Sequence, residues 1–109
     1  MKVIFLPEVR EYFDFLADKL FQKEYFVFEE NARKYAKELF DDIEENLPNH
    51  WKKPAPKTFE KLGKDMYYSG FRSNKKTTWY AFFTKYEENG EEVYLVRHIE
   101  NNHTVAHLL

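Results

Sequence analysis

Three strand-forming segments separated by short turns occupy much of the second half of the chain, and they constrain its fold most. The segments are rich in tyrosine, phenylalanine, tryptophan, valine and threonine, the residue types that favour strands. They span residues 66–72, 78–86 and 92–99. The polar segment 73–76 separates the first two, and Asn89-Gly90, a dipeptide that favours a tight hairpin turn, separates the second from the third. Because short connections join antiparallel neighbours, the pattern predicts an antiparallel meander.

The first half of the chain carries helical periodicity after a short opening strand. Residues 2–6 form an apolar run that suits a strand and is stopped by Pro7. Apolar residues then recur at spacings of three and four along two stretches, the pattern of helices that bury one face. These residues are Val9, Phe13, Leu16 and Leu20 in the first stretch, and Ala32, Tyr35, Ala36, Leu39 and Ile43 in the second. Residues 24–28 are predicted to be the turn between the helices, and Pro48 ends the second helix.

The expected order is strand, helix, helix and three strands, an α+β fold in a single domain of residues 1–109. Both helices need an apolar surface to pack on. We therefore expect them on one face of the sheet, with the other face left available. Residues 49–64 are predicted to be a connecting loop. The tail, residues 101–109, is expected to form no independent element, with three apolar residues able to dock it: Val105, Leu108 and Leu109.

Composition excludes several classes of protein. The chain contains no cysteine, which excludes a disulfide framework, a thiolate nucleophile and a zinc site with cysteine ligands. Hydrophobic residues make up 43 % of the chain, too many for intrinsic disorder. The N-terminal apolar run is short for a signal peptide, and no stretch approaches the ~20 apolar residues of a membrane span. These features predict a soluble, cytoplasmic protein.

Neither a metal nor a cofactor is expected. The spacings of His98, His103 and His107 match no known metal-ligand pattern, and no cysteine or carboxylate completes a ligand set. The sequence also lacks a glycine-rich phosphate loop and a Ser–His–Asp order.

Positive charge is concentrated in one part of a chain whose formal net charge is −2. Residues 52–85 contain nine Lys or Arg against two acids, Glu60 and Asp65, and aromatic residues are interleaved with them. A local positive field attracts polyanions. Cations beside rings on which bases stack are typical of surfaces that bind RNA or single strands. The alternative is an ordinary solvated basic face over an aromatic core.

Three local strings follow one another in an informative order. They are Lys57-x-x-x-Lys61-Leu62-Gly63-Lys64, the strand pair 66–72 and 79–83, and the ending 94–99 followed by Asn101-Asn102-His103. Together they resemble the RelE/ParE superfamily of toxins from bacterial toxin–antitoxin pairs, over essentially the whole chain. The resemblance implies a toxin with a cognate antitoxin as its partner. Such a toxin acts either on mRNA and the ribosome as a RelE-like endoribonuclease, or on DNA gyrase as a ParE-like inhibitor.

The sequence leaves three activities open. The basic and aromatic second half favours a nuclease. RelE-like nucleases carry two lysines and an arginine at positions that here fall near Tyr68, Gly70 and Tyr80, and this difference favours a ParE-like inhibitor. A protein that keeps the toxin fold and only binds a partner is the third alternative.

Two residues are the leading catalytic candidates. RNA cleavage of this class needs a base for the 2′-hydroxyl proton, cations that stabilise the phosphorane, and an acid for the leaving oxygen. His103, just past the last strand, is the candidate for proton transfer, because histidine titrates near neutral pH. Arg72 is the candidate phosphate clamp, because a guanidinium is always charged and binds bidentately. The alternatives are a surface histidine and a strand-end arginine paired with an acid.

Further candidates come from the same half of the chain. Tyr80 could stack on a base or act as an acid, with core packing as its alternative. Arg97 is also a catalytic candidate, and strand alternation predicts that only one of Arg97 and His98 reaches the open face. The predicted contacts to RNA are Lys57, Lys61, Lys64, Lys75, Lys76 and Tyr68.

Overall fold

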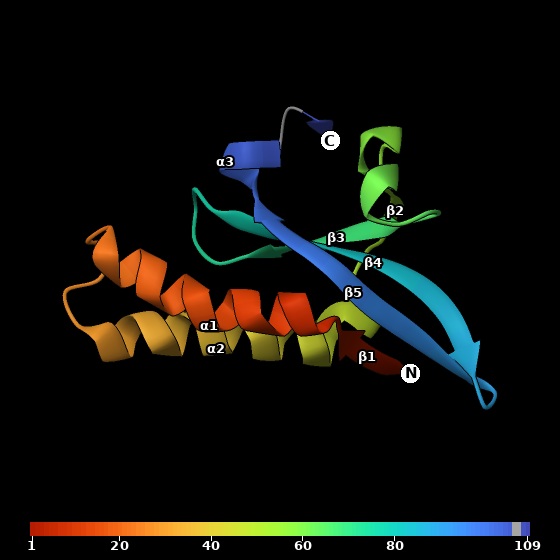
Figure 1. The fold of residues 1–109 in the computed structure, drawn as a ribbon, viewed down its shortest axis with the longest axis horizontal. Helices are drawn as coiled ribbons and strands as arrows, with labels where there is room; N and C mark the ends of the chain where they lie inside the picture. Colours follow the sequence, from red (N-terminus) through yellow and green to blue (C-terminus); the bar gives the residue numbers. More distant parts are fainter. Residues whose placement is uncertain (106–107) are drawn as a thin grey trace.

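Two helices packed on one face of a five-stranded sheet form the framework of the protein in the computed structural model of the chain (Figure 1). The structure describes residues 1–105 and 108–109. The helices are α1 (Pro7–Gln22) and α2 (Glu29–Asn46). The strands are β1 (Lys2–Phe5), β2 (Lys53–Pro54), β3 (Tyr67–Arg72), β4 (Thr78–Glu88) and β5 (Glu91–Asn101). Three short elements complete the chain: η1 (Leu47–Asn49), η2 (Lys57–Leu62) and α3 (Asn102–Val105). None of the described helices is both long and apolar enough to cross a membrane.

The sheet is mixed, with the order β1-β5-β4-β3-β2. The strands β3, β4 and β5 form the antiparallel meander that the sequence predicts, which confirms the α+β fold and the order of its elements. β1 adds to the edge of the meander by pairing in parallel with β5, and Lys2 lies opposite Val93. β2 pairs antiparallel with β3 at the other edge.

The hairpin between β4 and β5 has the predicted tight turn. Asn89 and Gly90 have φ angles of 54° and 80°, the left-handed conformations that a type I′ turn needs at both central positions. In the strand pairing next to the turn, Glu87 lies opposite Glu92 and Glu88 lies opposite Glu91. All four side chains are exposed. Like charges directly opposite each other destabilise a strand pair, so this turn forms against local repulsion.

Replacing Glu87 by lysine is therefore expected to stabilise the protein. The lysine would lie opposite Glu92 and exchange a repulsive cross-strand pair for an attractive one, raising the free energy of unfolding by about 0.5 kcal/mol. Urea unfolding at low salt measures the change. Glu87→Gln, which only removes the repulsion, should give a smaller gain, and high salt should diminish both gains. Equal stability of all three proteins at low salt would contradict this account of the hairpin.

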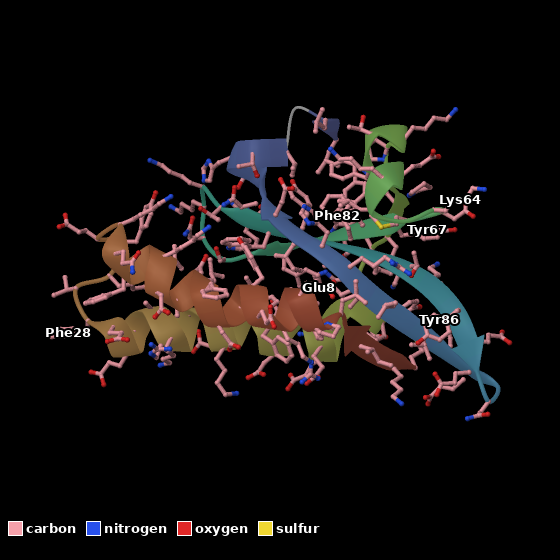
Figure 2. The ribbon with its side chains drawn as sticks, in the orientation of Figure 1. Glu8, Phe28, Lys64, Tyr67, Phe82 and Tyr86 are labelled. Carbon is pink, nitrogen blue, oxygen red and sulfur yellow. The ribbon has the colours of Figure 1, made fainter. Side chains whose placement is uncertain are left out.

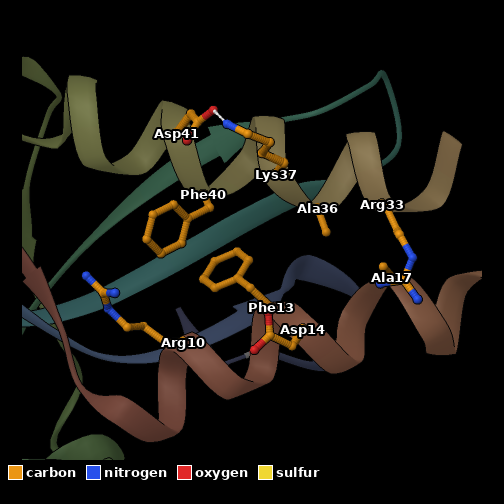
Figure 3. Close-up of a pocket in the computed structure, with 9 residues that line it drawn as sticks. All are labelled: Arg10, Phe13, Asp14, Ala17, Arg33, Ala36, Lys37, Phe40 and Asp41. Atoms are coloured by element: carbon orange, nitrogen blue, oxygen red, sulfur yellow. Dashed lines mark hydrogen bonds and ion pairs between the residues drawn. The ribbon is translucent and has the colours of Figure 1, made fainter. Parts of the chain in front are cut away.

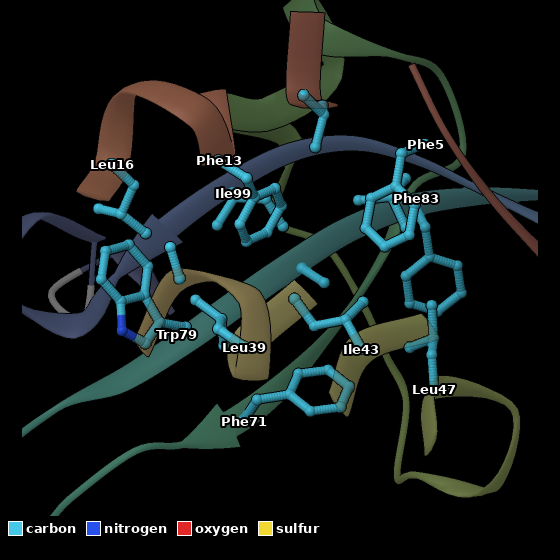
Figure 4. Close-up of a cluster of buried hydrophobic side chains, with 14 of the residues drawn as sticks. Phe5, Phe13, Leu16, Leu39, Ile43, Leu47, Phe71, Trp79, Phe83 and Ile99 are labelled. Carbon is cyan, nitrogen blue, oxygen red and sulfur yellow. The ribbon is translucent and has the colours of Figure 1, made fainter. Parts of the chain in front are cut away.

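The main apolar core lies between the helices and the sheet (Figure 4). The predicted apolar faces of both helices are buried in it, for example through Phe13 of α1 and Ile43 of α2. The strands β1, β3, β4 and β5 contribute the core residues of the sheet, which are Phe5, Phe71, Trp79, Ala81, Phe83, Tyr94, Val96 and Ile99. The indole N–H of Trp79 donates a hydrogen bond to Tyr35 of α2 at 2.8 Å, so the one polar atom of this large side chain is satisfied where it is buried.

The opposite face of the sheet is only partly open. A second apolar cluster covers it, formed by Phe59, Met66, Tyr68, Phe82 and Val105. The ring of Phe59 in η2 stacks on Phe82 with centroids 4.4 Å apart, and Figure 2 shows Phe82 on the side of the sheet away from α1 and α2. The expectation that this whole face is available is therefore wrong, because η2 and α3 each bury apolar residues on it.

Two segments differ from their predicted form. The predicted connecting loop 49–64 contains β2 and η2, since Phe59 finds an apolar surface on the sheet. The tail forms one helical turn, α3, instead of no element. Val105 docks the tail as expected and is 2 % exposed, whereas Leu108 and Leu109 are 38 % and 37 % exposed.

Candidate nucleic-acid interface

The loop between β3 and β4, residues 73–77, is fixed from two sides at one end of the sheet. The side-chain oxygen of Asn74 accepts hydrogen bonds from two backbone N–H groups later in the loop, at 2.9 Å each. Such a turn stabilises the loop from within. Asn102, at the start of α3, donates a hydrogen bond to the carbonyl of Lys76 at 3.0 Å. The loop thus presents the exposed side chains of Lys75 and Lys76 on a fixed backbone.

Arg72 and His103 contact this same loop from different elements. Arg72 donates hydrogen bonds through Nε to the carbonyl of Asn74 at 3.1 Å, and through Nη2 to that of Lys75 at 3.2 Å. The Nε2 atom of His103 lies 3.4 Å from the hydroxyl oxygen of Thr77. Among the described residues Arg72 has no acidic partner, so its alternative role in a strand-end ion pair is not observed. Both leading candidates thus contact the loop 73–77, at different residues, and their catalytic roles stay predictions.

Two predicted tyrosines lie on the face that Arg72 occupies. Arg72, Gly70 and Tyr68 alternate with residues that face the main core, as predicted for a regular strand. Tyr80 on β4 is the direct partner of Gly70, and its ring meets that of Tyr68 edge to face with centroids 5.9 Å apart. Tyr80 is half-buried, whereas Tyr68 is 7 % exposed and belongs to the second cluster. Tyr80 is therefore the more accessible of the two rings.

A groove of about 400 Å³ opens beside Tyr80. Its lining consists of Trp51, Lys53, Tyr68, Gly70, Arg72, Thr78, Tyr80 and Leu109. The indole ring of Trp51 packs closely on Gly70: a Cβ atom added to Gly70 would lie only 2.9 Å from the ring. The indole meets Tyr68 edge to face at 5.6 Å, and the Lys53 ammonium lies 5.6 Å from its centroid. The lining has two cationic side chains, aromatic rings and no aspartate or glutamate, a combination suited to a single-stranded polyanion.

Sequence reasoning missed Trp51 and Lys53 as site residues, because the pairing of β2 with β3 that brings them to Gly70 joins segments far apart in the sequence. One signal for them was present. A glycine inside a strand pattern often marks the close approach of another group, and Gly70 is such a glycine. The sequence does not state which group approaches it.

A β-bulge changes the expected position of Arg97. Phe82 and Phe83 are adjacent on β4, but their partners on β5 are two residues apart, which leaves Arg97 as the extra residue. Arg97 donates a hydrogen bond to Thr84 at 3.1 Å, and the ring of His98 lies 5.7 Å from that of Phe82. Both side chains thus lie on the face away from α1 and α2. The prediction that only one of them reaches this face is wrong, because the bulge interrupts the alternation.

His98 is held by its neighbours more closely than His103 is. Its Nε2 atom is hydrogen-bonded to Glu100, whose other oxygen accepts a hydrogen bond from Thr104 at 3.0 Å. Glu100 also acts on Tyr12 of α1. The pKa of Tyr12 is raised mainly by burial and secondarily by the negative charge of Glu100. A carboxylate partner fixes the orientation of an imidazole ring. His98 is therefore the better-oriented histidine, and His103 is the more exposed one.

The predicted RNA-binding lysines are exposed and free of acidic partners within the described part of the chain. They are Lys57, Lys61, Lys64, Lys75 and Lys76, and Figure 2 shows Lys64 pointing outward beyond η2. Lys52 is partly withdrawn from solvent, and burial, followed by the charge of Lys85, lowers its pKa. The ion pairs concentrate instead on the helices, for example between Lys37 and Asp41 at 2.7 Å. The cations of residues 52–85 thus form no ion pair within the described part of the chain.

A larger groove, of about 500 Å³, lies between α1 and α2 (Figure 3). Its charges are mixed, with Arg10, Arg33 and Lys37 facing Asp14 and Asp41. Lys37 forms an ion pair with Asp41, and Arg33 forms ion pairs with one carboxylate on each of the two helices. Because Arg33 and Lys37 are already paired with carboxylates, the groove is less suited to a polyanion than the one beside Tyr80.

No group of three or more histidine, aspartate or glutamate residues in the described ranges could hold a metal ion. His107, which the sequence analysis considered with His98 and His103, lies outside these ranges.

Fold and surface together define a small α+β protein with two N-terminal helices on a mixed five-stranded sheet and a basic, aromatic groove on the other face. No protein-family model matches the chain, and no curated protein and no solved structure matches it significantly.

Proposed function

We propose that the protein is the toxin of a type II toxin–antitoxin pair, and that it is a RelE-like endoribonuclease that cleaves mRNA on the ribosome without a metal ion. The observation that carries this proposal is the convergence of Arg72 and His103 on one loop, beside lysines that have no acidic partner among the described residues. The resemblance of the sequence strings to the RelE/ParE superfamily supplies the substrate class.

The chemistry assigned to the site is a transesterification. The 2′-oxygen of the RNA attacks the adjacent phosphorus, the bond to the 5′-oxygen breaks, and a 2′,3′-cyclic phosphate remains. Arg72 stabilises the extra negative charge of the phosphorane, and His103 transfers a proton to or from one of the two oxygens. Tyr80 and Arg97 lie on the same face of the sheet and are the next candidates for proton transfer and charge stabilisation.

Cleavage in a translating extract tests the proposal. Purified protein added to the extract should cut mRNA within ribosome-bound regions and lower protein synthesis, and primer extension locates the cuts. The protein carrying both His103→Ala and Arg72→Ala is the matched control. Intact mRNA together with undiminished synthesis in the presence of the wild-type protein would rule out the nuclease.

The cognate antitoxin is proposed to bind through an acidic, amphipathic segment. The exposed, uncompensated lysines of residues 52–85 attract such a segment, and electrostatic attraction accelerates association. The association rate should therefore fall as salt concentration rises. Equal rates at low and high salt would exclude steering by these lysines.

A ParE-like inhibitor of DNA gyrase is the second candidate. One observation favours it: the strand positions at which RelE-like nucleases carry lysines fall near Tyr68 and Gly70, where an indole ring packs instead. Inhibition of gyrase supercoiling without RNA cleavage would decide for this candidate. A protein harmless on strong expression would instead point to a module that only binds a partner.

A further inference from the structure

We propose that Trp51 is a stacking platform for one unpaired base of single-stranded RNA, and that Lys53 and Arg72 hold the phosphates on either side of that base. The proposal rests on the proposed function for its choice of RNA as the ligand. It assigns a binding role to Trp51, which lies in the segment predicted to be a connecting loop, and to the groove that Trp51 lines.

The exposure of Trp51 is the first argument. Trp51 is 49 % exposed, whereas the other tryptophan, Trp79, is 3 % exposed and anchors the core. An indole so exposed leaves much apolar surface in water. A base stacked on the ring would remove that surface from solvent, and stacking tolerates any base because every base has a π-face.

The indole is also held in place before any ligand arrives. The absence of a side chain at Gly70 lets the ring approach the strand, and the edge-to-face contact with Tyr68 restrains it on another side. Tyr68 is itself buried in the second cluster, so the support is rigid. A ring that is ordered beforehand loses little conformational entropy when a base stacks on it.

The charges around the indole select the ligand. Lys53 and Arg72 line the same groove as Trp51, and no aspartate or glutamate side chain lines it. The charged side chains that a strand passing through the groove would meet are therefore both cations. The bases of a duplex are already stacked on one another, so a ring in a groove favours a single strand.

Trp51 fluorescence measures the interaction directly. The probe is a 2′-O-methyl RNA of mixed adenine and cytosine, about ten nucleotides long to match common single-strand site sizes. It has no free 2′-hydroxyl and cannot be cleaved. The single strand should quench the emission that wild-type protein shows in excess of Trp51→Phe, and the same strand annealed to its complement should not.

Affinity and its salt dependence separate stacking from charge. Trp51→Ala should weaken binding roughly 10- to 100-fold, as expected for the loss of one stacked base, without changing the slope of log K against log salt. Lys53→Ala should lower the magnitude of that slope by about 0.7, as expected when one phosphate contact is lost. Tyr25→Ala removes an even more exposed ring, on the turn between α1 and α2, and should leave binding unchanged.

Equal affinity of wild type and Trp51→Ala, equal quenching by the duplex, or no binding of the probe would each overturn the proposal. The measurement uses no cleavage and no ribosome. It therefore stays separate from the proposed nuclease, which the translating extract tests: a wild-type protein that cuts mRNA, together with a Trp51→Ala variant that binds the probe as tightly as wild type, would refute the stacking role alone.

Discussion

Replacing His103 or Arg72 by alanine is expected to lower the rate of mRNA cleavage by about 100-fold or more in each case, the usual cost of losing one acid–base or charge-stabilising group. His103→Ala removes an imidazole in α3, just past the end of β5, and should leave the fold intact, because this side chain is exposed. Arg72→Ala removes the guanidinium and the hydrogen bonds to two loop carbonyls. Single-turnover cleavage in a translating extract, with circular dichroism to verify folding, measures both effects.

Two further variants test whether the roles are assigned correctly. Arg72→Lys keeps a positive charge but not the bidentate geometry, so it should recover only part of the activity. Lys57→Ala removes at most one contact to the RNA backbone and should weaken binding mildly at low salt, by an amount that shrinks as the salt concentration rises. Full toxicity of the double variant His103→Ala/Arg72→Ala would place the site elsewhere, with Tyr80 and Arg97 as the next residues to replace.

Replacing Phe82 by alanine is expected to lower the free energy of unfolding by about 3–5 kcal/mol, the typical cost of truncating a buried phenylalanine. Phe82 is fully buried, stacks on Phe59 of η2 and contacts the rings of Tyr68 and His98. It therefore joins η2 to the sheet beneath the groove. Urea unfolding gives the loss of stability, and a change below about 1 kcal/mol would mean that the second cluster is loosely packed.

The adjacent residue provides a matched control. Phe83 is also fully buried but faces the main core, where it contacts Tyr94. Phe83→Ala should cost about as much stability, within the same 3–5 kcal/mol range. Under conditions where both variants are folded, only Phe82→Ala should also weaken binding of single-stranded RNA, because it removes support from Tyr68 behind the groove. Equal RNA affinity of the two variants would mean that the second cluster does not support RNA binding in the groove.

Local patterns predicted most of the fold. The apolar spacing that includes Phe13 and Ile43 marks the buried faces of α1 and α2, and Asn89-Gly90 marks the β4–β5 turn, because each pattern depends on residues close in sequence. The parallel pairing of β1 with β5 joins residues about ninety positions apart, Lys2 with Val93, and leaves no local pattern. The elements η2 and α3 were missed for the same reason, since distant apolar contacts stabilise them.

The candidate site could be predicted in part. The alternation of β3 correctly placed Arg72 on the face of Tyr68, and the structure also brings His103 to the neighbouring loop. The position of Arg97 could not be predicted, because a bulge shifts the register by one residue without a signal in composition. The placement of Trp51 could not be predicted either, because it depends on how the chain returns from α2 to the sheet edge.

The length of β4 gives the molecule two electrically opposite ends. The strand runs from Thr78, beside the loop that carries Lys75 and Lys76, to Glu88, beside the hairpin turn and its opposed glutamates. In the field of a large polyanion such as a ribosome, the glutamate end is repelled and the lysine end is attracted. The resulting torque would turn the molecule during approach, so that it arrives with the Arg72 end first, before any specific contact has formed.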